Sequence, residues 1–195
     1  MSEIVSINGA FLEAEAICID PSDRGFTVGD GVFDTMLAID GQPVDADAHF
    51  ERLARHAKIL HIPVDTTPLP DIAAALLQKN NVLQGRIAIR TTLTRGPGPR
   101  GLKPPQEPQP TLLMRTSPAP APPGPATVIV AQTVRRNEGS PLSRIKSLNA
   151  GDQILALREA LDRGADDALL LNNQRKLCCA TAGNVFVRIG GAWLT

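Results

Sequence analysis

The feature that most limits the fold of this chain is a proline-rich stretch in its middle. Of the 17 prolines in 195 residues, 11 lie between positions 97 and 125. Proline fixes the backbone angle φ and lacks an N–H donor, so such a stretch cannot be helical and stiffens the chain into a spacer. Within it, only residues 111–115 have the composition of a strand. We therefore expect two domains, residues 1–116 and 126–195, joined by a linker at residues 117–125.

The first predicted domain mixes strands and helices. Runs of β-branched residues predict strands, and apolar residues that recur every three or four positions predict helices. Asp47 is a candidate N-cap of the longer helix, and Asp40-Gly41 predicts a hairpin turn. The expected strands are residues 4–9, 16–20, 32–39 and 86–95, and the expected helices are residues 48–61 and 71–80.

The second predicted domain has the same mixed character. Asp152 is a candidate cap for its helix, and Gly164 is a candidate stop. The expected strands are residues 126–133, 168–172, 184–189 and 192–195, and the expected helix is residues 152–163. The two halves together predict an α/β (α+β) protein.

Charge and composition exclude several functions. The net charge is zero and no basic run is present, so nucleic acids and membranes are poor candidates for partners. The chain lacks a long apolar run and a signal-peptide pattern, from which we expect a soluble, cytoplasmic protein. Its three cysteines, two of them adjacent, fit a reducing compartment better than a disulfide framework. The histidines His49, His56 and His61 lie along one predicted helix, which favours structural roles over a metal site.

Lys146 lies in the connection between a predicted strand and a predicted helix. Connections on a rigid frame often display functional side chains. Most lysines, however, are solvated surface charges, so the residues alone leave both interpretations open.

A resemblance gives this lysine a role. The run Arg144–Asn149, followed by Asp152–Ala160, resembles the lysine region of the fold-type IV pyridoxal-phosphate enzymes. These are the branched-chain aminotransferases, the D-amino-acid aminotransferases and the 4-amino-4-deoxychorismate lyases. The resemblance implies that Lys146 binds pyridoxal 5'-phosphate covalently and moves the substrate's α-proton, since an amine of lowered pKa serves as nucleophile and base. It also implies a two-domain fold, with a β-barrel-like C-terminal domain carrying the lysine, a cofactor cleft between the domains, and a homodimer.

Two further stretches are similar to the same family. Asp23–Thr35, with three glycines in seven residues, resembles its N-terminal signature. In His49–Leu53, the pattern implies that Arg52 grips the cofactor phosphate, for which a guanidinium fork is well shaped. The loop from Arg95 to Gly101 looks most like that of the aminodeoxychorismate lyases, and it implies that Arg95 and Arg100 hold a substrate carboxylate.

The chain departs from the family pattern at the position that faces the cofactor's ring nitrogen. The family has a glutamate five residues before the asparagine that is Asn184 here, and counting back from Asn184 gives Cys179. The resemblance implies that both Cys179 and Asn184 contact the cofactor. A shift of one residue in the strand would give Cys178 instead. A neutral thiol cannot hold a proton on the ring nitrogen as a carboxylate does, so we expect a weaker electron sink and an elimination rather than a full transamination.

A second departure is length. Family members continue well past Thr195, so we expect the C-terminal domain of this chain to be incomplete, truncated relative to the family. Three hypotheses follow. The chain is a lyase that releases pyruvate and leaves 4-aminobenzoate for folate synthesis, an aminotransferase of D- or branched-chain amino acids, or an inactive truncated relative.

Overall fold

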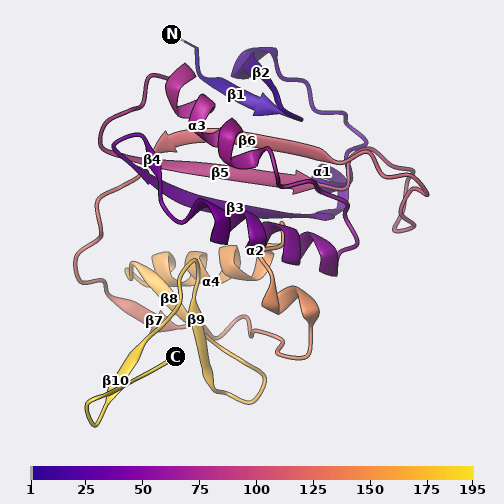
Figure 1. Cartoon of the computed structure of the whole chain (residues 1–195). Coiled ribbons are helices and arrows are strands. Elements are labelled where there is room, and N and C mark those ends of the chain that lie inside the picture. Colours follow the sequence, from indigo (N-terminus) through magenta and orange to yellow (C-terminus); the bar gives the residue numbers. More distant parts are fainter. Residues whose placement is uncertain (1) are drawn as a thin grey trace. The chain divides into compact units, whose positions relative to one another are not determined.

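The computed structural model describes residues 2–195, which form two compact units (Figure 1). The first unit contains the chain up to Ala121 together with Ile145–Leu148, and the second contains Pro122–Arg144 and Asn149–Thr195. The division after Ala121 falls inside the proline-rich stretch, where a chain without regular hydrogen bonds makes few contacts with either side.

The first unit is built on a six-stranded antiparallel sheet. The spatial order is β2-β1-β6-β5-β3-β4. The strands are β1 (Ile4–Ile7), β2 (Ala10–Glu13), β3 (Gly31–Ile39), β4 (Gln42–Pro43), β5 (Arg86–Thr94) and β6 (Thr111–Pro118). Burial alternates along β3 and β5, so alternate side chains of these strands enter the core. The predicted strands at 32–39 and 86–95 are confirmed to within one residue.

Two helices cover one face of this sheet (Figure 1). They are α2 (Ala46–Ile59) and α3 (Leu69–Lys79), and a short helix, α1 (Arg24–Val28), precedes β3. The largest completely buried apolar side chains come from both helices and from β5 and β6: Leu53, Leu69, Leu76, Leu77, Ile89, Leu93 and Met114. Burial of each such side chain contributes about 1.5–3 kcal/mol, so the first unit has a core of its own.

The start of the first unit differs from the sequence prediction. The predicted strand at residues 16–20 is wrong, because the strand that pairs with β1 is β2, and residues 14–16 form a 3-10 helix, η1 (Ala14–Ala16). Asn8 and Gly9 have φ of 49° and 84°, the left-handed backbone of a two-residue hairpin turn. This turn reverses the chain earlier than the prediction allowed. Asp40 and Gly41, with φ of 46° and 76°, form the second hairpin as predicted.

The second unit is smaller. It contains β7 (Val128–Val130), η2 (Pro141–Arg144), α4 (Gly151–Asp162), β8 (Asp167–Leu171), β9 (Leu177–Ala180), β10 (Val187–Ile189) and β11 (Ala192–Leu194). β8 is parallel to β7 and antiparallel to β9, and β10 and β11 form a separate hairpin. Small residues of α4, Ala156 and Ala160, pack with Ala131, Ala168 and Leu170 of the sheet side. The helix can therefore lie close to the sheet.

A β-barrel-like arrangement is not seen in the part of the second unit that the structure describes. Closure of a barrel requires every strand to be paired on both edges. Among residues 122–195, β7 and β9 are the outer strands of a three-stranded sheet, and the hairpin does not join it. The barrel-like domain was expected to be incomplete in this chain, so it stays a prediction.

No helix within residues 2–195 has the length and apolar character needed to cross a membrane.

Candidate active site

The segment that carries Lys146 is an additional edge of the first unit's sheet. Phe33 donates its backbone N–H to the carbonyl of Lys146 (2.9 Å), and Leu148 donates to the carbonyl of Gly31 (3.0 Å). Val32 and Ser147 lie opposite each other between these bonds. The prediction that residues 126–195 carry the lysine as part of the C-terminal domain is therefore corrected: these bonds place the segment in the first unit.

Gly31 explains part of the glycine-rich signature. A Cβ at Gly31 would lie 2.7 Å from Cδ1 of Leu148 and 2.5 Å from the carbonyl oxygen of Leu93. The carbonyl oxygen of Leu93 belongs to the backbone of β5, so a side chain at position 31 would disturb the pairing of β3 with β5, whereas the Leu148 methyl group ends a flexible side chain and could move aside. The signature thus includes a glycine at which β3 and β5 approach each other closely, beside the segment 145–148.

The side chain of Lys146 lies on the same side of the sheet as Phe33. Side chains alternate along strands, and Val32 and Ser147 are buried, so their neighbours point to the other face. The ammonium Nζ of Lys146 lies 5.2 Å from the centroid of the Phe33 ring, and Cζ of Arg90 lies 4.0 Å from it. Burial lowers the pKa of Arg90. The candidate catalytic amine therefore shares the Phe33 ring with a second cation, the guanidinium of Arg90.

Arg52 is held by a buried carboxylate. Its Nε and Nη2 each donate to Asp34 at 2.7 Å, and Nδ1 of His49 also lies 2.7 Å from Asp34. Asp34 is buried, while the side chain of Arg52 is 34% exposed. Burial raises the pKa of Asp34, but the hydrogen bonds and charges of Arg52 and His49 outweigh it, so the pKa lies below its ordinary value. The side-chain hydrogen bonding between Arg52 and Asp34 also raises the pKa of Arg52.

Replacing Asp34 by alanine should therefore destabilise the first unit. Loss of one partner of a buried ion pair typically costs about 3–5 kcal/mol. Because Arg52 is partly exposed and can regain water, we expect about 2–3 kcal/mol. Urea unfolding followed by far-UV circular dichroism measures this change. The control is Glu51→Ala, whose exposed pair with Arg55 spans 3.9 Å and should change stability by less than about 0.5 kcal/mol. An equal, small loss in both variants would contradict the structural role of Asp34.

The structure corrects the role of Arg95. Its side chain is 10% exposed, and its Nε donates to Asp30 at 2.7 Å. The remaining hydrogen bonds go to Asp30 and to the carbonyls of Leu60 and His61 at the end of α2. A guanidinium so fully engaged in a buried network is not available for a substrate carboxylate. Sequence could not reveal this, because an arginine in a glycine- and proline-rich loop has the same pattern whether it faces a ligand or an aspartate of the same chain.

Arg24 is the other partner of Asp30. Its Nε donates to Asp30 at 2.8 Å, and its two other nitrogens donate to the carbonyls of Gly101, Leu102 and Lys103. This arginine therefore fastens the end of the loop that contains Arg100. Arg100 itself is exposed, in keeping with its predicted contact with a ligand, which stays a prediction.

Cys179 and Asn184 lie in the second unit, where they form an isolated β-bridge. Cys179 is opposite Leu170 on β8 and packs against the small core of this unit, whereas Cys178 is exposed. Burial raises the pKa of the Cys179 thiol, so it stays neutral near pH 7. The predicted contacts of Cys179 and Asn184 with a cofactor stay predictions.

The residues of the first unit fit pyridoxal phosphate chemically. The cofactor needs an amine for its aldehyde and cationic donors for its phosphate. Lys146 supplies the amine, and hydrogen bonds to β3 fix the backbone of its segment. None of the hydrogen bonds described within residues 2–195 uses Nη1 of Arg52, so this nitrogen keeps two N–H donors for a phosphate oxygen. The sequence had identified both residues, but not their contacts with Asp34, Phe33 and His56; of these three, only His56 had been singled out, as a structural residue.

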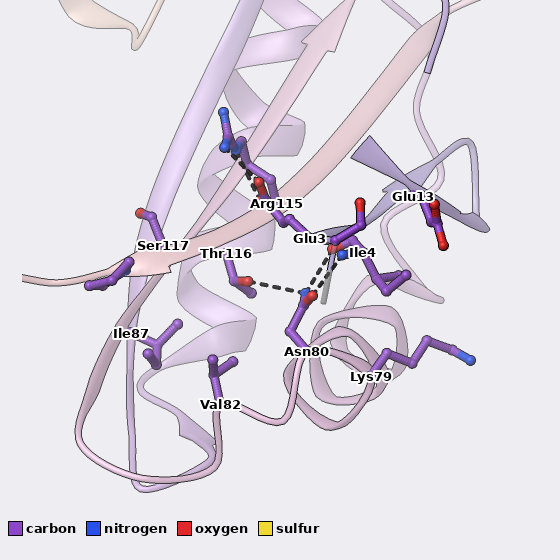
Figure 2. Close-up of a pocket in the computed structure, with 12 residues that line it drawn as sticks. Glu3, Ile4, Glu13, Lys79, Asn80, Val82, Ile87, Arg115, Thr116 and Ser117 are labelled. Atoms are coloured by element: carbon purple, nitrogen blue, oxygen red, sulfur yellow. Dashed lines mark hydrogen bonds and ion pairs between the residues drawn. The ribbon is translucent and has the colours of Figure 1, made fainter. Parts of the chain in front are cut away.

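A separate pocket lies at another part of the first unit (Figure 2). It has a volume of about 630 Å³, and its lining includes Glu3, Lys79 and Arg115. The side chain of Asn80 accepts a hydrogen bond from the backbone N–H of Ile4 and donates one to its carbonyl, both at 2.7 Å. Arg115 pairs with Glu3 at 2.8 Å. None of the predicted site residues lines this pocket. Because neither Lys146 nor Arg52 lines it, this pocket is not the candidate active site.

Comparison with known families identifies one match, to amino-transferase class IV, over residues 31–195. A relative from Methanocaldococcus jannaschii that carries the name branched-chain-amino-acid aminotransferase is 31% identical over 98% of this chain and 67% of its own length. A D-alanine aminotransferase of Staphylococcus epidermidis is 35% identical over 56% of this chain and 39% of its own. The aminodeoxychorismate lyase of Bacillus subtilis is 27% identical over 96% of this chain and 65% of its own.

Among solved structures, the branched-chain aminotransferase of Thermoproteus uzoniensis superimposes with a TM-score of 0.90 at 22% identity. The match covers 99% of this chain and 67% of that one. The two proteins therefore share a fold. The chain spans about two thirds or less of the length of each of these four proteins.

Proposed function

The chain belongs to the class IV aminotransferase family, and on that premise we propose that it provides the catalytic lysine of a pyridoxal-phosphate lyase that resembles 4-amino-4-deoxychorismate lyase. The observation that carries the proposal is the fixation of Lys146 on the edge of β3, with its amine beside Phe33. The hydrogen bonds of Lys146 with Phe33 and of Leu148 with Gly31 fix the backbone of this segment, so the amine is presented from a defined position.

Each of these residues of the first unit has a separate role in the proposed reaction. Pyridoxal phosphate, when bound, supplies an aldehyde that captures an amine and a ring that withdraws electrons. Nζ of Lys146 would hold the aldehyde carbon, and the same amine would take the α-proton of the substrate. Nη1 of Arg52 would hold the phosphate, and Asp34 fixes the orientation of that guanidinium. Arg100 is the remaining candidate for the substrate carboxylate.

Cys179 favours an elimination over an amino transfer. Because burial raises its pKa, the thiol remains neutral and cannot hold a proton on the ring nitrogen as a carboxylate would. A weaker electron sink suffices where loss of the α-proton is followed by departure of a leaving group. In the proposed reaction that group leaves as pyruvate, and 4-aminobenzoate, a precursor for folate, remains.

An aminotransferase is the second candidate. It is supported by the 31% identical relative, which carries the name of a branched-chain aminotransferase, and by the 35% identical stretch shared with a D-alanine aminotransferase. Such an enzyme would use the same lysine and the same phosphate grip.

Product analysis separates the two. The chain is loaded with pyridoxal phosphate and supplied with 4-amino-4-deoxychorismate, and in parallel with D-alanine or leucine plus 2-oxoglutarate. The lyase predicts pyruvate and 4-aminobenzoate in equal amounts in the first mixture only. Glutamate formed in the second mixture would instead establish the aminotransferase. No product in either, together with no bound cofactor, would favour an inactive relative.

The resemblance also supports a homodimer located in the cytoplasm, and we include both in the proposal. Sedimentation equilibrium of the purified chain tests the dimer. A mass of 20.7 kDa at all concentrations would contradict it.

A further inference from the structure

His56 connects α2 to the backbone of the catalytic lysine. Its Nδ1 accepts the backbone N–H of Lys146 at 3.2 Å. The carbonyl of Lys146 is bonded to Phe33, and Ile145 is buried in the core of the first unit. His56 is thus the contact that satisfies the N–H of Lys146, while β3 satisfies its carbonyl.

This bond requires one form of the imidazole. Nδ1 accepts a hydrogen bond only when the ring is neutral and its proton lies on Nε2. In the doubly protonated ring both nitrogens are donors, so the N–H of Lys146 would face another N–H.

The charges around His56 mostly oppose its protonation. Arg52 and Arg55 come from its own helix, Lys146 from the segment that it holds, and Asp34 from β3. Burial and the charge of Arg52 lower the pKa of His56, Asp34 acts in the opposite direction, and Arg55 and Lys146 lower it further. The net pKa lies below the ordinary value of 6.5, so the neutral ring predominates at pH 7.

We propose that His56 is a positioning residue whose neutral imidazole holds the backbone of Lys146, and whose protonation releases the segment 145–148. The hold itself is a property of the folded chain. Its consequence for catalysis rests on the proposed function, because only then does the position of the Lys146 amine matter.

The direction of the pH effect follows from the lowered pKa. A histidine that is harder to protonate in the folded protein contributes stability that is complete above pH 6.5 and declines as the pH falls through the folded pKa. The segment should therefore be held at neutral pH and loosen in the acid range below pH 6.5.

The tautomer and the amide of Lys146 can both be observed without cofactor or substrate. Long-range ¹H–¹⁵N correlation spectra of His56 should show an unprotonated Nδ1 and a protonated Nε2 at pH 7.5. Amide exchange at Lys146, corrected for the intrinsic pH dependence, should lose protection about tenfold or more on acidification through the pKa of His56.

Three variants make the test specific. His56→Asn keeps an acceptor near Nδ1 but does not titrate, so protection should be retained and become independent of pH. His56→Leu removes the acceptor, so protection should be low at every pH. His61→Asn is the control: His61 is exposed and has φ of 53°, which asparagine tolerates, so the wild-type pH profile should persist.

Two outcomes would overturn the proposal: a protonated Nδ1 at pH 7.5, or a His56→Asn variant that keeps the wild-type pH dependence. Neither depends on turnover. Failure of the proposed reaction, with the exchange results as expected, would therefore refute the lyase assignment and leave the role of His56 intact.

Discussion

Replacing Lys146 by alanine is expected to abolish the visible absorption of bound pyridoxal phosphate and to lower turnover by at least about 10³-fold. The amine is proposed to act as nucleophile and as base, and loss of a general acid or base alone typically costs 10²–10⁴-fold. The fold should survive, because the segment is held through the backbone of Lys146 and not through its side chain. Absorption spectra after incubation with cofactor, together with urea unfolding, measure both effects.

The control for this experiment is Lys58→Ala. Lys58 lies on the exposed surface of α2, so its removal should leave the absorption band and the stability unchanged within about 0.5 kcal/mol. An absorption band of equal intensity in Lys146→Ala would mean that another amine binds the cofactor, and the assignment of Lys146 would be abandoned.

The unit to which Lys146 belongs shows the limit of prediction from local patterns. The strand from Gly31 to Ile39 was predictable, because its β-branched residues and flanking glycines are local signals. The motif around Lys146 was recognisable through its resemblance to the family, which is also carried by neighbouring residues. Their pairing was not, since the bridge between Val32 and Ser147 joins positions more than 100 residues apart. Nothing in a single sequence specifies which free strand edge a distant segment will occupy.

The arginines show a different limit. Arg52 and Arg95 were both assigned to ligands, yet each binds an aspartate: Asp34, whose side chain is 3% exposed, and Asp30, whose side chain is 14% exposed. Asp34 and Asp30 stand inside the glycine-rich signature, where their sequence context resembles that of any loop or strand end. Whether a carboxylate faces a guanidinium depends on the packing of α2 and β5 against β3, which periodicity does not encode. Arg52 keeps exposed donors and Arg95 does not, and this difference in burial decides which of them remains a candidate for a ligand.

Replacing Asp30 by alanine should produce the largest loss of stability in the first unit. Asp30 pairs with Arg24 at 2.8 Å and with Arg95 at 2.7 Å, and both guanidinium side chains are at most 10% exposed. Removing the carboxylate leaves two buried cations without a counter-ion, for which about 3–5 kcal/mol is expected. The stability of most domains is 5–15 kcal/mol, so the variant should be close to unfolding. Urea unfolding followed by far-UV circular dichroism measures the loss, because the only tryptophan, Trp193, lies in the second unit.

Two further measurements test whether the loss of stability comes from the charge of Asp30 and from its burial: the dependence on pH, and the removal of an exposed ion pair of equal length. Burial raises the pKa of Asp30, but the hydrogen bonds and charges of Arg95 and Arg24 outweigh it and lower the pKa below 3.8. Its contribution is therefore complete above pH 3.8 and is lost as the pH falls through the folded pKa, a loss that Asp30→Asn should lack. Asp162→Ala breaks a pair with Arg158 that also spans 2.8 Å but is well exposed, so it should cost less than about 0.5 kcal/mol. Equal losses in Asp30→Ala and Asp162→Ala would mean that the buried network adds nothing beyond a surface ion pair, and that Arg95 is free to serve a ligand after all.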